Sequence, residues 1–351
     1  MGEQSIDRAV REAMRAGQVP GIVAAVARGA DPAEFHVVGE DARGQPLAAD
    51  SLFPVASITK LATALVVLRL CDAGLLALDD PLEQHLPEAL AARPGVTLRA
   101  LLCHTAGLPI DVAPVHAPYA EGLDWQALGA ACLLTPLEAP PATRVQYGNV
   151  GYGLLALMVE RRTGEHFPAA LARLVLGPLG VEAYLGDEPP RRPAVLAGVR
   201  GKHAGTPLEP FNSPFYRSLA LPWAGMVTNV AGALAIVRTF RDPQFLSAAT
   251  AAAATADQTG GLSGGFVEPL FWKPCPWGLG PDLRGAKSPH WVPAEAGADS
   301  FGHSGASGCL AWYAPAADLA WAIFGARTAD NGWLLRRSPA LSTAILAQGD
   351  V

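Results

Sequence analysis

Charged residues are scarce in this chain, and lysine is rare among them. Only 17% of the 351 residues are charged, the formal net charge is −6, and the lysines number four: Lys60, Lys202, Lys273 and Lys287. A nucleic-acid-binding surface needs clustered basic residues and a positive charge balance. The composition therefore argues against nucleic acid as a partner.

Long apolar runs are also missing. The longest candidate, residues 61–78, is interrupted by Arg69, Asp72 and Gly74, so no stretch reaches the length of a membrane span. The Met1–Gln18 segment predicts an amphipathic helix and lacks the apolar run and cleavage site of a signal peptide. We therefore expect no membrane partner and a cytoplasmic location.

Metal-binding patterns are absent from the sequence as well. The five cysteines, at 71, 103, 132, 275 and 309, contain no Cys-x-x-Cys pair, and no two of the eight histidines stand at metal-ligand spacing on a predicted helix. We interpret the cysteines as reduced packing residues and expect neither a metal nor another cofactor.

The Ser57-Ile58-Thr59-Lys60 stretch is the most informative feature that is present. Residues i and i+3 share a helix face, so the Lys60 amine can reach the Ser57 hydroxyl, which is a poor nucleophile without an adjacent base. The apolar residues that follow predict a buried helix ending at Gly74. A Ser-x-x-Lys pattern alone is common on solvated helices, but a lysine inside an apolar helix points to a nucleophile and its base.

A second segment, Tyr147-Gly148-Asn149, lies directly before a predicted helix over residues 151–162. The tyrosine could pass a proton to a leaving group, and the asparagine amide could hold a substrate carbonyl or the lysine. Taken alone, a buried structural tyrosine is the commoner interpretation.

A third segment, His303-Ser304-Gly305-Ala306, precedes two predicted strands, Cys309–Ala314 and Leu319–Gly325. Its small residues would let a substrate lie along a strand edge, and the Ala306 N–H could be an oxyanion donor. A glycine-rich turn before a hairpin is the alternative.

In this order, the three segments resemble the serine β-lactamase and penicillin-binding-protein superfamily, in particular its class C β-lactamase and family VIII esterase branch. The likeness covers nearly the whole chain. The helix after residue 228 carries Gly232 where the family usually has aspartate. Further segments that match are Val19–Val23, Leu52–Pro87, Leu101–Pro109, Tyr147–Gly164, Leu176–Gly180 and Ala224–Thr228.

The resemblance implies an α+β fold of the β-lactamase/transpeptidase type, an antiparallel sheet flanked by helices with an inserted helical lobe. We expect residues 1–65 and 215–351 to form the sheet lobe, residues 66–214 the helical lobe, and the site to lie between them. Hydrophobic periodicity predicts helices over 5–16, 228–240 and 333–346 and a hairpin of strands 22–28 and 34–39.

The resemblance also implies a serine hydrolase that works through an acyl-enzyme. Ser57 would attack a carbonyl, and Lys60 would take the serine proton. Tyr147 would relay a proton to the leaving group and then activate water, and Asn149 would orient the substrate carbonyl or the lysine. The backbone N–H groups of Ser57 and Ala306 would hold the oxyanion. Whether Lys60 or Tyr147 is the base stays open, because the two share a proton network.

His303 stands where β-lactamases of this branch usually carry the lysine of Lys-Thr-Gly. Without that permanent cation we expect small carboxylic esters rather than β-lactams as the acyl substrate. An acyltransferase or amide-forming or peptidase enzyme, and an inactive binding module, are the alternatives. The predicted substrate-binding residues are Ser304, Gly305, Phe215 and Tyr216, and the oligomeric state is left open.

Two rival motifs carry little weight. Gly261–Gly265 fits G-x-S-x-G, but no buried strand precedes it and Val267-Glu268-Pro269 follows, so we interpret it as a flexible loop. Gly151–Ala156 fits a dinucleotide fingerprint without the surrounding βαβ unit.

His104 is predicted to be structural, at a helix end. Specificity is expected from loops 110–124, 207–216 and 262–277, with the aromatic residues Phe211, Phe215, Tyr216, Phe271 and Trp272.

Overall fold

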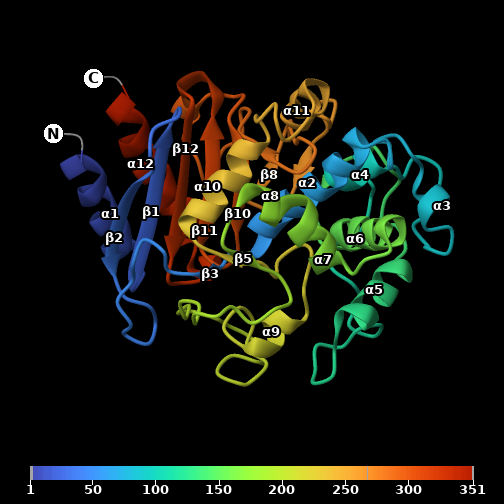
Figure 1. Cartoon of the computed structure of the whole chain (residues 1–351), viewed down its shortest axis with the longest axis horizontal. Coiled ribbons are helices and arrows are strands. Elements are labelled where there is room, and N and C mark those ends of the chain that lie inside the picture. The colour runs from blue at the N-terminus through green and yellow to red at the C-terminus, as the bar shows by residue number, and fades with distance from the viewer. Residues whose placement is uncertain (1–2, 267, 350–351) are drawn as a thin grey trace.

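A six-stranded antiparallel sheet built from both ends of the chain forms one side of the molecule (Figure 1). The computed structural model describes residues 3–266 and 268–349. The strand order is β2-β1-β12-β11-β10-β9. The strands are β1 (Gly21–Arg28), β2 (Glu34–Gly39), β9 (Asp282–Leu283), β10 (Phe301–Gly305), β11 (Cys309–Ala314) and β12 (Leu319–Gly325).

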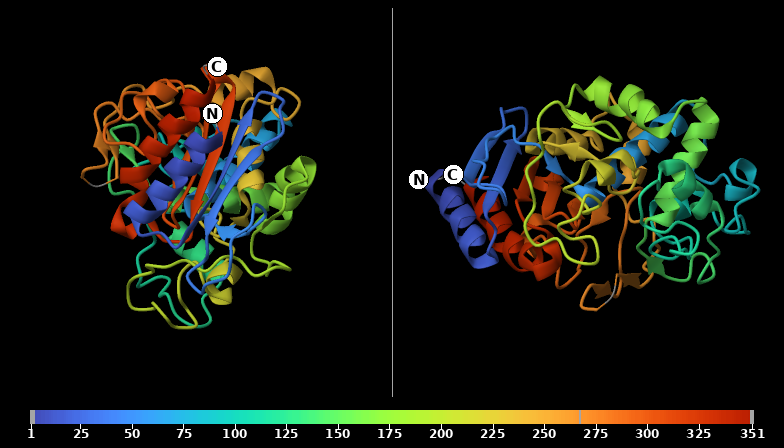
Figure 2. Two further views of the ribbon diagram at one scale, coloured as in Figure 1. Left: turned by 90° about the vertical axis from the view of Figure 1, so that its left-hand side faces the viewer. Right: turned by 90° about the horizontal axis from the view of Figure 1, so that it is seen from below.

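Helices cover both faces of this sheet. The terminal helices α1 (Glu3–Gly17) and α12 (Trp333–Leu346) pack side by side on one face, and α10 (Val230–Thr239) packs on the other (Figures 1 and 2). Strand β1 is therefore apolar on both sides: Ile22 and Val26 join the core under α1 and α12, whereas Val23 and Ala25 join the core under α10.

The second side of the molecule is helical, and the buried helix α2 (Thr59–Asp72) connects it to the sheet (Figure 1). Helix α2 ends as predicted, because Gly74 adopts φ +68° and its N–H bonds to the Cys71 carbonyl at 2.9 Å. The other helices there are α3 (Leu82–His85), α4 (Leu98–Leu102), α5 (Trp125–Leu133), α6 (Val150–Thr163), α7 (Phe167–Leu171) and α8 (Gly177–Leu179), with α9 (Pro214–Ser218) and α11 (Ala248–Ala254) in the later connections.

Two small three-stranded sheets join segments that are distant in the sequence. One consists of β3 (Phe53–Pro54), β6 (Val227–Thr228) and β5 (Ala183–Tyr184), and the other of β4 (Val145–Gln146), β7 (Gly264–Gly265) and β8 (Phe271–Trp272). The sequence predicts a flexible loop at Gly261–Gly265, and this is wrong for its last two residues: Gly264 and Gly265 pair in parallel with β4. Neither glycine can carry a side chain there, because a Cβ would lie 1.9 Å from the Val145 carbonyl oxygen at Gly264 and 2.6 Å from the Leu270 carbonyl oxygen at Gly265.

The predicted α+β class, an antiparallel sheet flanked by helices with a helical part beside it, is confirmed. The predicted strands and terminal helices appear at nearly the predicted residues, but β10 occupies the segment for which a turn was the alternative, and the turn begins only at Ala306. The bounds of the two lobes stay a prediction. The segment around Ala194 and Ala197 belongs to the expected helical lobe, but its N–H groups donate to the Leu52 and Ala326 carbonyls on the sheet side. Met1, Gly2 and Val267, which entered the predicted amphipathic segment and the loop argument, lie outside the described residues.

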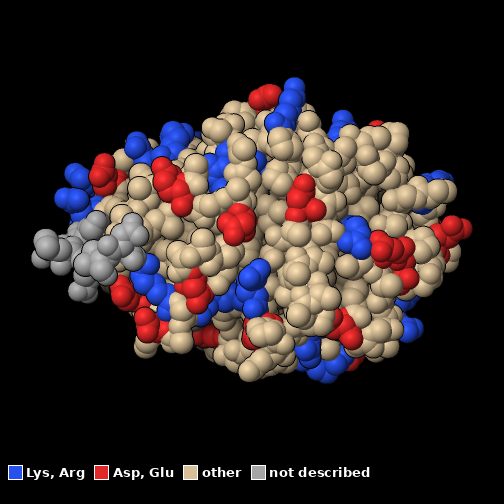
Figure 3. Space-filling view, turned by 90° about the horizontal axis from the view of Figure 1, so that it is seen from above, with Lys and Arg blue, Asp and Glu red and all other residues tan. Residues whose placement is uncertain are grey.

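Charges of both signs are interspersed on the face that Figure 3 shows, and uncharged residues dominate it. Across residues 3–266 and 268–349, no helix has both the length and the apolar character needed to cross a membrane. The same residues contain no group of three or more His, Cys, Asp or Glu side chains that could hold a metal ion.

Candidate active site

Ser57 lies in a 3₁₀ turn, Ala56–Ile58, that runs directly into α2. The prediction placed it in the first turn of the helix itself. The turn is tight because Ala56 adopts φ +46°, and the Thr59 hydroxyl holds it by donating to the Ala56 carbonyl at 2.6 Å and accepting from the Met226 N–H at 3.1 Å. Thr59 thus connects the Ala56–Ile58 turn to Met226, directly before β6, and Ser57 keeps partial solvent exposure.

The Lys60 amine has three acceptors and no contact with solvent. Its Nζ lies 3.3 Å from Ser57 Oγ, 2.7 Å from Asn149 Oδ1 and 3.2 Å from the Trp223 carbonyl oxygen. Burial lowers the pKa of Lys60 to about 7, although the charge of Asp111 opposes this shift. Near neutral pH the amine is therefore partly unprotonated and within reach of the serine proton.

Tyr147 is positioned by the small sheet and by aromatic packing. Its N–H donates to the Gly265 carbonyl at 3.0 Å, and its ring centroid lies 4.6 Å from that of His104 and 4.2 Å from that of Phe266. Its hydroxyl is hydrogen-bonded to Ser57, yet burial raises the pKa of Tyr147 above its usual value. The phenol therefore carries its proton at neutral pH.

Asn149 and the loop beside it show a residue that the sequence analysis missed. The Asn149 Nδ2 donates to Asp111 Oδ1 at 2.6 Å, and its backbone N–H donates to the Ile110 carbonyl at 2.6 Å. Gly148 allows this approach, because a Cβ there would lie 2.7 Å from the Pro109 carbonyl oxygen. A hydrogen-bonded chain thus runs from Lys60 through Asn149 to the exposed Asp111.

His303 is buried and uncharged at neutral pH. Its Nδ1 and the Ser304 carbonyl oxygen are 2.7 Å apart, a geometry in which Nδ1–H donates. Burial and the nearby Lys60 lower the pKa of His303 to about 4. The prediction of a site without a permanent cation at this position is consistent with this environment.

Strand β10 presents an open edge next to the nucleophile turn. Pairing with β9 covers only Phe301 and Gly302, so the edge of β10 beyond Gly302 has no strand partner on that side among the described residues. Gly305 packs so closely that a Cβ would lie 2.3 Å from the Val55 carbonyl oxygen. Ala306, the first residue of the following turn, is exposed, and its carbonyl accepts the Ala329 N–H at 2.8 Å.

The two aromatic residues predicted to bind substrate lie on α9, next to each other. Phe215 packs edge-on against Tyr119, with ring centroids 5.3 Å apart, and lines a cavity whose walls include none of the candidate catalytic side chains. Tyr216 is buried against Phe211; burial, with the charges of Tyr119 and Asp111, raises its pKa. The substrate-binding roles of Phe215 and Tyr216 stay predictions.

A buried charged cluster supports the aromatic wall of the site. Trp277 lies edge-on to both His104 and His303, and the Lys287 Nζ lies 4.8 Å from the Trp277 ring centroid. Lys287 forms an ion pair with Asp282, and the Asp282 Oδ2 also lies 3.1 Å from the His290 Nε2. Burial alone would raise the pKa of Asp282, but Lys287 and His290 hold it at about 2. Sequence reasoning missed this cluster, and the rarity of lysine was the one available signal.

Comparisons with known proteins agree with this geometry. The Beta-lactamase family model matches residues 6–338. Esterase EstB from Burkholderia gladioli is 31% identical over 294 residues, which cover 73% of this chain and 74% of the esterase. A β-lactamase structure from Mycobacterium bovis is 30% identical with a TM-score of 0.69, covering 97% of this chain and 100% of its own. EstCE1, described as a hydrolase with promiscuous acyltransferase activity, shares the fold at 21% identity and a TM-score of 0.76, covering 98% of each chain.

Proposed function

Since the chain belongs to the β-lactamase family of serine hydrolases, we propose that it is an esterase that forms an acyl-enzyme on Ser57. The observation that carries the proposal is the environment of Lys60. A buried amine, bonded to Ser57, Asn149 and a backbone carbonyl and with a pKa near 7, is suited to accept a serine proton.

In the first half of the reaction, the Ser57 oxygen attacks the ester carbonyl while its proton passes to the network of Lys60 and Tyr147. The backbone N–H groups of Ser57 and Ala306 stabilise the negative oxygen of the tetrahedral intermediate. The intermediate collapses as the alcohol leaves with a proton from the same network. Water then attacks the acyl-enzyme and gives a proton to the network, and the network returns a proton to the Ser57 oxygen as the carboxylic acid is released.

The charges around the site favour esters without a negative group. His303 is neutral, and the exposed Asp111 carboxylate lies at the outer end of the hydrogen-bonded chain. A β-lactam carboxylate would find no permanent cation at residue 303. A charge-assisted hydrogen bond contributes roughly 1.5–3 kcal/mol, so its loss costs about ten- to a hundredfold in rate or affinity.

The experiment compares kcat/KM for p-nitrophenyl acetate and butyrate with kcat/KM for a cephalosporin. We expect the esters to be turned over at least about tenfold faster, the lower end of that range. A His303→Lys variant should raise the relative rate on the cephalosporin. Hydrolysis of the cephalosporin as fast as the best ester by the unmodified protein would contradict the esterase assignment.

The same assay separates the alternatives. With benzyl alcohol added, an acyltransferase would form the benzyl ester in place of free acid, and an amine acceptor would report amide formation in the same way. An inactive binding module would turn over none of these substrates. Intact Ser57, Lys60 and Tyr147 in one bonded cluster favour catalysis over binding alone.

A further inference from the structure

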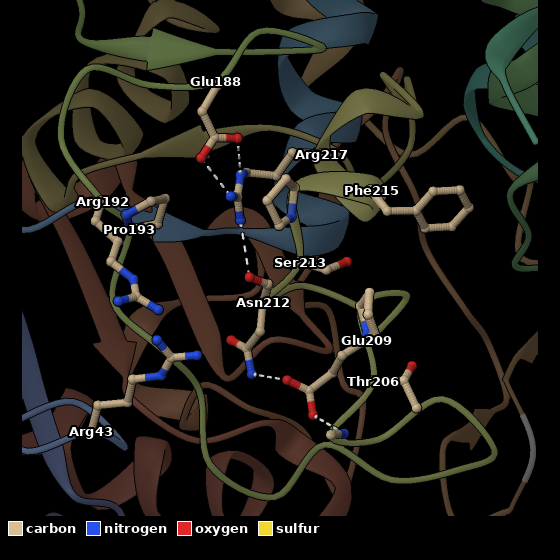
Figure 4. Close-up of a pocket in the computed structure, with 13 residues that line it drawn as sticks. Arg43, Glu188, Arg192, Pro193, Thr206, Glu209, Asn212, Ser213, Phe215 and Arg217 are labelled. Carbon is tan, nitrogen blue, oxygen red and sulfur yellow. Dashed lines mark hydrogen bonds and ion pairs between the residues drawn. The ribbon is translucent and has the colours of Figure 1, made fainter. Parts of the chain in front are cut away.

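A cavity of about 640 Å³ lies apart from the catalytic side chains, between the loop that follows β2 and the segments 188–193 and 205–217 (Figure 4). This volume is within the range of small-molecule sites, about 300–1,000 Å³. Its walls combine Arg43, Arg192 and Arg217 with an apolar side formed by Phe215 and prolines.

Both carboxylates in the cavity wall, Glu188 and Glu209, accept hydrogen bonds from neighbouring residues. Glu188 receives two hydrogen bonds from the buried guanidinium of Arg217, at 2.5 and 2.9 Å. Glu209 accepts from the Asn212 Nδ2 at 2.8 Å and from the Gly205 N–H at 2.7 Å. The acidic side chains therefore fix the frame of the cavity.

Arg43 and Arg192 differ from Arg217 in having no such partner. Both arginines are exposed, and their guanidinium groups, which point toward each other in Figure 4, make no hydrogen bond or ion pair with any residue in 3–266 or 268–349. Both also line an adjoining hollow of about 300 Å³. Two neighbouring cations repel each other, and an anion placed between them would relieve that repulsion.

Backbone hydrogen bonds join the two segments that carry these arginines. The buried Asp41 carboxylate accepts the N–H groups of Arg43, at 2.7 Å, and of Val195, at 3.0 Å. The Ala42 N–H donates to the Val195 carbonyl at 2.9 Å. The loop that carries Arg43 and the segment that carries Arg192 are thus joined. The Asp41 carboxylate that joins them accepts backbone N–H groups and forms no ion pair with either arginine.

We propose that this cavity binds a small organic oxyanion, a carboxylate or a phosphate monoester, with its negative group between Arg43 and Arg192 and its apolar part toward Phe215. Guanidinium groups match the oxygens of both anions through paired hydrogen bonds. The proposal does not depend on acyl-enzyme formation, because the cavity contains none of the residues assigned to catalysis; it does assign Phe215, a predicted substrate-binding residue, to this second cavity.

Isothermal titration with phenyl phosphate, phenylacetate, inorganic phosphate and benzyl alcohol tests it. We expect saturable binding of phenyl phosphate or phenylacetate, weaker binding of inorganic phosphate and none of benzyl alcohol; the stronger of the two aromatic anions identifies the preferred head group. In the Arg43→Ala/Arg192→Ala double variant binding should weaken at least about tenfold, the effect of losing one charge-assisted hydrogen bond. Ester turnover should not change.

The matched control is Arg162→Ala, which removes an exposed arginine on α6 that lines neither hollow. It should bind as the unmodified protein does. Equal binding by the double variant and the unmodified protein, or no saturable binding of either aromatic anion at millimolar concentration, would overturn the proposal. If the double variant loses ester turnover, the single variants Arg43→Gln and Arg192→Gln replace it in the same comparison.

Discussion

Lys60 combines burial, charge and proposed reactivity in one side chain. Only its neutral form can accept the Ser57 proton, and its pKa is about 7. Ester kcat/KM should therefore rise with pH through about pH 7 and then level off, and Lys60→Ala should lower turnover by about 10²–10⁴. A pH–rate profile from 5 to 9 is the measurement, and a flat profile would contradict the role of the lysine. His303, with a pKa of about 4, does not titrate in that interval.

The same burial predicts a cost in stability. The pKa of Lys60 is 10.5 ordinarily and about 7 when folded, so between these values the unfolded chain binds more protons and stability rises with pH. Lys60→Met removes this dependence. From pH 6.5 to pH 9.5, the unfolding free energy of the unmodified protein should rise by about 3 kcal/mol more than that of the variant, given about 1.4 kcal/mol per pKa unit. Urea unfolding at both pH values measures this. An equal difference in unfolding free energy between the two proteins at both pH values would contradict a lowered pKa of Lys60 in the folded protein.

Asp111 is expected to position Asn149 and to tune Lys60. Asp111→Asn keeps an acceptor for the Asn149 Nδ2 but removes the charge that raises the pKa of Lys60, so the rising limb of the pH profile should move to lower pH with little change in the plateau. Asp111→Ala should move the limb in the same way and also lower the plateau. If the profiles of both variants coincide with that of the unmodified protein, Asp111 is only a surface residue.

At the scale of elements, the start of α6 tests how closely the site depends on backbone contact. A Cβ on Gly148 would lie 2.7 Å from the Pro109 carbonyl oxygen, whereas a Cβ on Gly151, one turn later, meets nothing closer than 3.5 Å. Gly148→Ala should displace the loop that carries Asp111 and lower kcat by about tenfold or more, since small misplacements can cost up to about a hundredfold. Gly151→Ala should keep kcat and raise the melting temperature, because alanine favours the helix. Equal kcat values for the two variants would contradict the positional argument.

Elements with strong apolar periodicity could be predicted from the sequence. Strands β11 and β12 and helix α12 begin and end where the pattern indicates. Strands β7, β9 and β10 could not, because they are short or rich in glycine and serine and exist through pairing with distant strands. Close backbone contacts explain their glycines: a Cβ on Gly302 would lie 2.1 Å from the Ala311 carbonyl oxygen.

At the scale of the whole molecule, the candidate catalytic residues could be named from the sequence because they stand in recognisable segments, and their catalytic roles stay a proposal. The fold brings Ser57, Lys60, Tyr147 and Asn149 into one hydrogen-bonded group. The Trp223 carbonyl and Asp111 were not predictable, since only the folded chain shows which distant backbone groups reach Lys60. The orientation of α9, which turns Phe215 toward another cavity, likewise depends on long-range packing against Tyr119.

The central claim is that Ser57 becomes covalently acylated. Intact-protein and peptide mass spectrometry after acid quench of a reaction with p-nitrophenyl butyrate, or after exposure to a fluorophosphonate, tests it directly. We predict one adduct on the peptide that contains Ser57, its absence in Ser57→Ala with the fold retained, and an unchanged adduct in the control Ser263→Ala. An adduct that persists in Ser57→Ala, or that is found on Ser263, would contradict the account.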